Sequence, residues 1–243
     1  MEKFTVRFAQ TEEEKNAVYA LRYRDMILQF RPEINFVNGM DITPYDDYAK
    51  QIICIDNETN DIVGCYRIIT SDDLPNGKGF VSEEEFDIRT LKNSGERIAE
   101  LSRACVKREY RNTAVLMLLL RFIVGYVREN GYRFVIGEAS FGGVDKNEYQ
   151  KELSYLTHFH KADDKYDIQS LEKEQIQTLA KEELCVTDIK HELPPLIRAY
   201  LSFGAKTSEQ SFTDREFGSV DVFVLLDMQD YNESYVNKLL RIN

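Results

Sequence analysis

The stretch AELSRACVKREYRN, residues 99–112, has the composition of a buried strand that runs into a turn, yet it places Glu100 and Arg103 among small and apolar side chains. Burying a carboxylate or a guanidinium is costly unless each charge finds a partner. Either the charges are paired structurally, Glu100 with Arg103 or with Arg67, or they belong to a working site. Residues three apart on a regular strand face opposite sides of the sheet, so these two side chains can share a site only if the strand is bulged between them.

The composition is that of an acidic globular protein. The 243 residues are 43% hydrophobic, which is enough for a substantial core, and the net charge of −11 argues against general nucleic-acid binding. Residues 97–133 nevertheless hold eight Lys and Arg against three Asp and Glu. This excess indicates a positive face for an anionic partner, unless the charges are only scattered and solvated.

Targeting and metal-binding patterns are missing from the sequence. The N-terminal sequence becomes polar within its first ten residues, and the uncharged stretch at 113–120 is far shorter than the ~20 apolar residues of a membrane span. We therefore expect a cytoplasmic protein. The four cysteines lack metal-ligand spacing, so we expect no metal site.

Hydrophobic periodicity predicts a single mixed α/β domain over residues 1–243. Strands are expected near 4–9, 51–56, 62–71, 98–106, 132–140 and in the tail at 205–228, and helices at 11–30, 113–130, 147–159 and 194–204. Residues 163–190 are acidic and poor in apolar side chains, which predicts a helical surface insertion. No repeat or linker divides these elements.

Six segments carry a family resemblance: LRYRDMI, IVGCYRII, RIAELSRACVKREYRN, GYRFVIGEASFGG, LSYL and LPPLIRAYLSFGAK. In order and spacing they resemble the N-acyl amino acid synthase family, which includes ornithine–acyl carrier protein N-acyltransferases. The resemblance spans about residues 17–227, and the Glu-x-x-Arg strand is more distantly similar to acyl-homoserine-lactone synthases. It implies the GNAT acyltransferase fold, an α+β fold whose mixed central sheet is splayed at a bulged strand and flanked by helices.

The resemblance also implies functional residues. It gives a catalytic role to Glu100 and Arg103, and substrate binding to Arg24, Asp46, Asp47, Arg67, Ser102 and Ser140. It also implies that the phosphopantetheine arm and its carrier are bound by Val106, Lys107, Arg108, Arg111 and Asn112. The sequence departs from the family at Gln51, where ornithine-acylating relatives often have histidine, and in the acidic insertion.

The chemistry of amide formation fits these side chains. An amine with a pKa of about 9–10 is protonated at pH 7, and freeing it costs about 3–4 kcal/mol, so a base must lie nearby. Glu100, half-buried on a central strand, is the candidate base, while the guanidiniums of Arg67 and Arg103 suit the carboxylate of the acceptor. The turn at 106–114 lacks the glycines of a CoA pyrophosphate loop, and its basic residues suit one phosphate of a carrier protein.

The sequence thus predicts an N-acyltransferase that moves a fatty or 3-hydroxyfatty acyl chain from acyl carrier protein to the amine of an amino acid of the ornithine or glycine type. The partners are the carrier and the amino acid, with no nucleic acid, no bound cofactor, and acyl-phosphopantetheine as co-substrate. The lipid product allows peripheral contact with the inner membrane face. Acyl-CoA remains an alternative donor. Two rival functions stay open, a CoA-dependent N-acetyltransferase and a non-catalytic module that binds acylated carrier protein.

Overall fold

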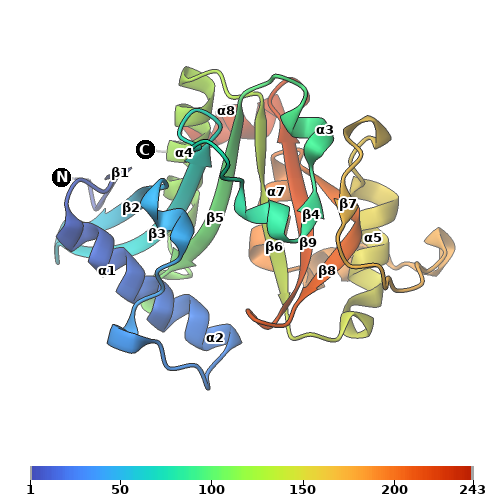
Figure 1. Cartoon of the computed structure of the whole chain (residues 1–243), viewed down its shortest axis with the longest axis horizontal. Coiled ribbons are helices and arrows are strands. Elements are labelled where there is room, and N and C mark those ends of the chain that lie inside the picture. Colours follow the sequence, from blue (N-terminus) through green and yellow to red (C-terminus); the bar gives the residue numbers. More distant parts are fainter. Residues whose placement is uncertain (1, 242–243) are drawn as a thin grey trace.

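A mixed seven-stranded sheet organises the protein in the computed structural model, which describes residues 2–241 (Figure 1). The strand order is β1-β2-β3-β5-β6-β9-β8, and of its neighbouring pairs β5–β6 is parallel while the others are antiparallel. The strands are β1 (Phe4–Phe8), β2 (Lys50–Asp56), β3 (Asp61–Thr70), β5 (Ile98–Val106), β6 (Phe134–Gly142), β8 (Lys206–Asp214) and β9 (Ser219–Asp227). A small second sheet pairs β4 (Phe86–Asp87) with β7 (Gln169–Ser170).

Helices cover both faces of the large sheet (Figure 1). The main core includes side chains of α4 (Val115–Glu129), α5 (Gln150–His160), α6 (Val186–Glu192), α7 (Pro195–Ser202) and α8 (Glu233–Leu240). On the opposite face, α1 (Glu12–Arg22) packs over β2, β3 and β5. The chain then continues through the π-helical turn η1 (Tyr23–Ile27) into α2 (Leu28–Phe30). Thr11 begins α1 as an N-cap, because its side chain accepts a hydrogen bond from the backbone N–H of Glu14.

Short helical turns shape the connections that lie near the site. Before β2 come the 3₁₀ turns η2 (Val37–Gly39) and η3 (Pro44–Asp47), and between β3 and β5 come η4 (Val81–Glu84) and α3 (Arg89–Lys92). A further turn, η5 (Arg108–Tyr110), joins β5 to α4, and η6 (Lys146–Tyr149) precedes α5.

The bulge expected on β5 is confirmed. Arg67 of β3 pairs with Ser102, but Cys65 pairs with Cys105, so one β3 residue faces both Arg103 and Ala104. Arg103 takes up the extra length with a left-handed φ of 54°, which is rare for a side chain other than glycine, asparagine or aspartate. The side chains after the bulge therefore change face relative to those before it.

Beyond the bulge, β5 and β6 separate. Their parallel pairing ends at Leu101↔Gly137, although β5 continues to Val106 and β6 to Gly142. Gly137 lies so close to β5 that a Cβ atom there would collide with the carbonyl oxygen of Leu101. Because Gly137 has no side chain, β5 and β6 can approach closely at the last pair of their ladder, after which they separate.

The segment 163–190 differs from the expected helical insertion. It contains two 3₁₀ turns, η7 (Asp164–Tyr166) and η8 (Lys181–Glu183), and the short strand β7, with α6 beginning only at Val186. The prediction of helix was therefore wrong for most of this segment. Some of its polar side chains form contacts with other loops, such as the ion pair of Glu172 with Lys146. The assignment of the whole chain to one domain stays a prediction.

Gly137→Ala is expected to lower the melting temperature by about 6–12 °C, because the added methyl group forces β5 and β6 apart and overpacking of this kind costs about 3 kcal/mol. Gly125→Ala is the matched control. Its Cβ would have no neighbour within 4 Å, and alanine favours helix α4. Calorimetry should show this control unchanged or more stable; equal melting temperatures for the two variants would contradict the proposed close contact.

Candidate active site

A cavity of about 550 Å³ opens where β5 and β6 separate, and we call it the slot. One wall is polar, with Ser102 and Arg103 from β5 and Glu138 and Ser140 from β6. The other wall is largely apolar and comes from α4 and α7, including Leu116, Leu196, Ile197 and Tyr200. A polar and an apolar reactant can therefore meet in one cavity.

Glu100 lies beside the slot without lining it. Its side chain is buried, with 1% of the residue exposed, and its carboxylate accepts hydrogen bonds from Val81 N (2.7 Å), Ser82 N (2.9 Å) and Ser82 Oγ (2.6 Å). Burial raises the pKa of Glu100, and these hydrogen bonds oppose the rise. Within residues 2–241 Glu100 forms no ion pair with Arg103 or Arg67. Glu100 thus holds η4 against the sheet.

Arg103 and Arg67, both predicted to be site residues, lie at different depths: Arg103 lines the slot and Arg67 is buried behind it. Arg103 lines the slot, donates from Nε to Asp41 (3.1 Å) and lies over the ring of Phe217. Arg67 is fully buried and donates to Ser102 Oγ (2.9 Å) and to Thr43 Oγ1. Burial, followed by the nearby charge of Arg103, lowers the pKa of Arg67 to about 10. Its Nη2 atom has no hydrogen-bond partner among the described residues.

A buried ion network fixes the loop that covers this wall. Asp46 accepts hydrogen bonds from Arg22 Nη1 (2.9 Å) and Gln51 Nε2 (2.9 Å), and Arg22 also binds Asp41 (2.7 Å). Burial alone would raise the pKa of Asp46, but the hydrogen bonds and charges of Arg22 and Arg67 outweigh it and lower the pKa to about 2. Gln51, at the position where histidine was expected, is therefore part of this network.

Some predicted substrate-binding residues do not reach the slot. Arg24 is 57% exposed and pairs with Asp25, and Asp47 is exposed on η3. Sequence reasoning instead missed Arg22, two residues earlier on α1, although its spacing from Val18 and Tyr19 puts it on the buried helical face. The functional roles predicted for Arg24 and Asp47 stay untested.

Glu138 is a second residue that sequence reasoning missed. It lines the slot from β6, and its Oε1 atom is buried without a hydrogen-bond partner among residues 2–241. Burial, and then the charges of Asp221 and Glu100, raise the pKa of Glu138, while Arg103 opposes them. A charged residue inside the apolar strand FVIGEAS was the available signal, and it is the same signal that singled out Glu100.

The basic turn after β5 borders the slot at the start of α4. Val106, Arg111 and Asn112 line the cavity, while Arg108 is exposed and Lys107 pairs with Asp61. The turn is held to η1 through Asp25, which accepts from the backbone N–H of Arg108 and, through its carbonyl, from Arg111. Asn112 and the first turn of α4 thus face the same cavity as the bulge.

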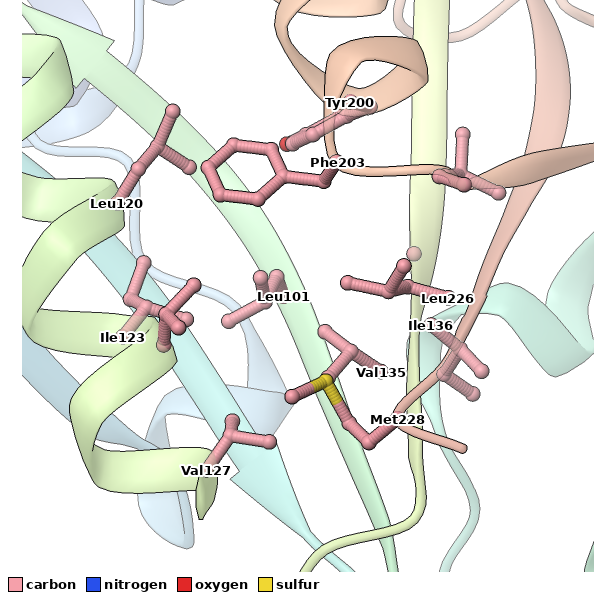
Figure 2. Close-up of a pocket in the computed structure, with 14 residues that line it drawn as sticks. Leu101, Leu120, Ile123, Val127, Val135, Ile136, Tyr200, Phe203, Leu226 and Met228 are labelled. Carbon is pink, nitrogen blue, oxygen red and sulfur yellow. The ribbon is translucent and has the colours of Figure 1, made fainter. Parts of the chain in front are cut away.

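A narrow apolar cavity of about 50 Å³ lies in the core next to the slot (Figure 2). Figure 2 shows Leu120, Ile123 and Val127 of α4 on one side, facing Leu101, Val135 and Leu226 of the sheet. Leu101 and Tyr200 line both the cavity and the slot. The hydroxyl groups of Tyr200 and Tyr66 lie 2.9 Å apart and hydrogen-bond at this junction.

Comparison with known proteins agrees with this geometry. The family model described as an acetyltransferase (GNAT) domain matches residues 21–121. The chain is an acyltransferase of the GNAT fold. The acyltransferase is 29% identical to the L-ornithine N(alpha)-acyltransferase of Rhodobacter capsulatus, with 96% of this chain and 93% of that protein covered. It is also 29% identical to the protein of the same name from Brucella abortus, with 96% and 87% covered.

Solved structures share the fold at low sequence identity. The acyl-homoserine-lactone synthase LasI matches the acyltransferase with a TM-score of 0.55 at 12% identity, covering 99% of this chain and 98% of LasI. The CoA-dependent acyl-homoserine lactone synthase MesI matches with a TM-score of 0.52 at 12% identity, covering 98% and 96%. Within residues 2–241, no helix is both long and apolar enough to cross a membrane.

Asp46→Asn is expected to destabilise the acyltransferase by about 3 kcal/mol at pH 7, because Arg22 and Arg67 lose a buried counter-charge. The lowered pKa of Asp46 contributes about 2 kcal/mol that is present above the unfolded value of 3.8 and is lost as the pH falls toward 2. The difference between wild type and variant should therefore narrow below pH 4 in urea unfolding. Asp47→Asn, its exposed neighbour, is the control, and an equal loss in both variants would refute the network's role.

Proposed function

We propose that this acyltransferase moves a long acyl chain from the phosphopantetheine thioester of acyl carrier protein to the α-amine of an amino acid of the ornithine type. The observation that carries the proposal is the slot, whose polar wall suits an amino acid and whose apolar wall shares Leu101 and Tyr200 with the core cavity. Relatives named L-ornithine N(alpha)-acyltransferase, which align over 96% of the chain, support the same acceptor.

In the proposed reaction, the amine nitrogen attacks the thioester carbonyl carbon, the carbon–sulfur bond breaks, and an amide forms. The ammonium form first loses one proton to give the free amine, the nitrogen loses a second proton as the amide forms, and the departing thiolate of the carrier's phosphopantetheine takes up one, so one proton is released overall. Glu138 accepts the amine's proton, because its carboxylate lines the slot and has a buried oxygen without a partner. Burial and the neighbouring carboxylates raise the pKa of Glu138, which makes its ionised carboxylate a stronger proton acceptor than an ordinary carboxylate.

Arg103 binds the carboxylate of the amino acid in this proposal. Arg103 donates to Asp41 through Nε, so its two Nη groups can donate to the carboxylate of the amino acid. Arg67 lies behind it, bound to Ser102, and adds positive charge to the same wall. With Arg24, Asp46 and Asp47 away from the slot, substrate binding rests on Arg103, Ser102 and Ser140.

The donor enters beside the basic turn. Lys107, Arg108 and Arg111 surround the start of α4, where backbone N–H groups favour an anion, and an acidic carrier protein complements this charge. The acyl chain then passes Tyr200 and enters the cavity between α4 and the sheet. Because that cavity is narrow, a long chain must displace the side chains of α4 and α7 as it enters. We propose a cytoplasmic enzyme. Its lipid-like product would bring it into peripheral contact with the membrane.

The proposed activity is tested by incubating the purified protein with a pool of amino acids and either an acylated carrier protein or the matching acyl-CoA at equal concentration. Mass spectrometry should find an N-acyl amino acid, formed at least tenfold faster from the carrier protein. Preference for acetyl-CoA would favour an N-acetyltransferase. Tight binding of acylated carrier protein without any acylated amine would favour a non-catalytic module.

Glu138→Gln is expected to lower kcat about 100-fold or more at pH 7, since a general base contributes that much. The deficit should shrink toward pH 9.5, where the amine loses its proton to solvent. Glu100→Gln is the matched comparison, and its deficit should not depend on pH in this way, because we assign Glu100 to holding η4. The opposite pH behaviour of the two variants would make Glu100 the base and Glu138 a bystander.

A further inference from the structure

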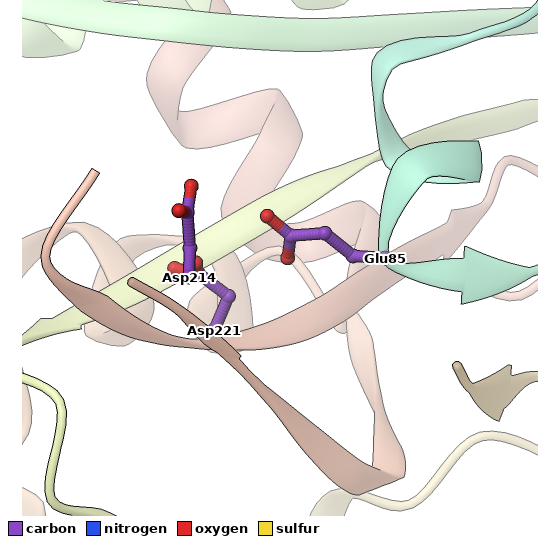
Figure 3. A group of neighbouring side chains, drawn as sticks. All are labelled: Glu85, Asp214 and Asp221. Carbon is purple, nitrogen blue, oxygen red and sulfur yellow. The ribbon is translucent and has the colours of Figure 1, made fainter. Parts of the chain in front are cut away.

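Three carboxylates converge in the wall of the slot, away from the bulge (Figure 3). Glu85 follows η4, Asp214 ends β8, and Asp221 lies on β9, and one oxygen of each lies within 4.8 Å of the others. Figure 3 shows the Glu85 side chain reaching from its loop toward the two aspartates. We call this group the acidic cluster. Glu138 is next to it, since its charge raises the pKa of Glu85, and the charges of Asp221 and Asp214 raise the pKa of Glu138.

The cluster is only partly satisfied by the protein. Asp214 Oδ1 accepts from the backbone N–H groups of Glu216 (2.8 Å) and Phe217 (2.7 Å), and Asp221 Oδ2 accepts from Ser219 (2.8 Å). Glu85 Oε2 and Asp221 Oδ1 are buried and lack a hydrogen-bond partner among residues 2–241. The two residues are themselves 8% and 3% exposed.

No lysine or arginine of residues 2–241 forms an ion pair with the cluster, although the charge of Arg103 acts to lower the pKa of Asp221. Within residues 2–241, none of its three carboxylates lies within 4.0 Å of a lysine or arginine nitrogen. Burial, together with the neighbouring carboxylates, raises the pKa of Glu85, and burial likewise raises that of Asp221. Buried carboxylates normally pair with a cation, so the missing positive charge indicates a cationic ligand.

The dimensions and surroundings of the cluster favour an ammonium group. An ammonium presents three N–H donors, and acceptors at about 2.9 Å in tetrahedral directions lie about 4.7 Å apart, which the spacing of the three oxygens allows. Arg103 lines the same slot and can hold a carboxylate. The slot therefore combines a cationic group with an anionic cluster, as a ligand carrying a carboxylate and a side-chain ammonium requires.

We propose that Glu85, Asp214 and Asp221 bind the side-chain ammonium of a diamino acid and thereby select it over neutral amino acids. This inference rests on the proposed function and names the residues that recognise the side chain of the acceptor amino acid. It also explains how one of two amines is acylated. Carboxylates around the side-chain amine keep it protonated and therefore not nucleophilic, whereas the α-amine lies toward Glu138 and can lose its proton.

The test compares ornithine with norvaline, which has the same carbon skeleton without the terminal amine. Wild-type enzyme should use ornithine with a kcat/KM at least 100-fold above that of norvaline. Asp221→Asn and Glu85→Gln should each lower the ornithine value 10-fold or more, mainly through KM, and leave the norvaline value unchanged or raised. Tandem mass spectrometry of the ornithine product should show acylation of the side-chain amine appearing in these variants.

A matched control and a folding measurement accompany these variants. Asp230→Asn removes an exposed carboxylate beyond β9 and should leave the ornithine-to-norvaline ratio unchanged. Melting temperatures of the cluster variants should stay level or rise, because a like charge is removed from a buried group. An unchanged ratio in a folded Asp221→Asn, Glu85→Gln double variant would overturn the inference.

Two further outcomes separate the inference from its alternatives. If EDTA abolishes the ornithine preference and Mg²⁺, Mn²⁺ or Ca²⁺ restores it, the cluster is a metal site and the inference is wrong. If the enzyme acylates ornithine and norvaline equally, the inference fails while the proposed function stands. If no amino acid is acylated, calorimetric titration with ornithine and norvaline still tests the cluster, and equal affinity for the two would overturn the inference by itself.

Discussion

The structure depends on the local conformation of Arg103. A left-handed residue in a central strand inserts one extra position between the pairs Arg67↔Ser102 and Cys65↔Cys105, and pairing with β6 ends at the residue two positions before it. This backbone conformation is costly for arginine, so surrounding contacts must hold it. The ion pair with Asp41, the ring of Phe217 and the β3 ladder supply them. The bulge and the end of the β5–β6 pairing thus lie within two residues of each other, at the slot.

The charges behind the bulge form a second layer that depends on the first. Asp41 is shared between Arg22 and Arg103, while Asp46 is shared between Arg22 and Arg67. Each buried guanidinium therefore has a carboxylate close by, which offsets the cost of desolvation. The network ties α1 and the loop before β2 to the bulged strand, so the side chain of Arg103 is held by Asp41 of that loop.

The sequence predicted the parts of this site that are local. The bulge was expected from placing Glu100 and Arg103 in one site, and the fold from the resemblance that these residues carry, although Glu100 does not line the slot. Contacts between distant segments could not be predicted in the same way. Arg22 and Arg24 both lie in LRYRDMI, and only the packing of α1 decides which is buried. Glu85, Asp214 and Asp221 come together through the register of β8 and β9 and the path of η4, which periodicity does not show.

The two members of the Glu-x-x-Arg pair make their contacts at different places, and the catalytic role predicted for them stays a prediction. Arg103 lines the slot directly. The carboxylate of Glu100 accepts hydrogen bonds from the backbone N–H groups of Val81 and Ser82. These residues begin η4, and Glu85 follows that turn directly. A carboxylate on β5 thus sets the position of a loop that carries a member of the acidic cluster. Shortening or neutralising Glu100 would therefore displace Glu85, which lines the slot, although Glu100 does not line the slot itself.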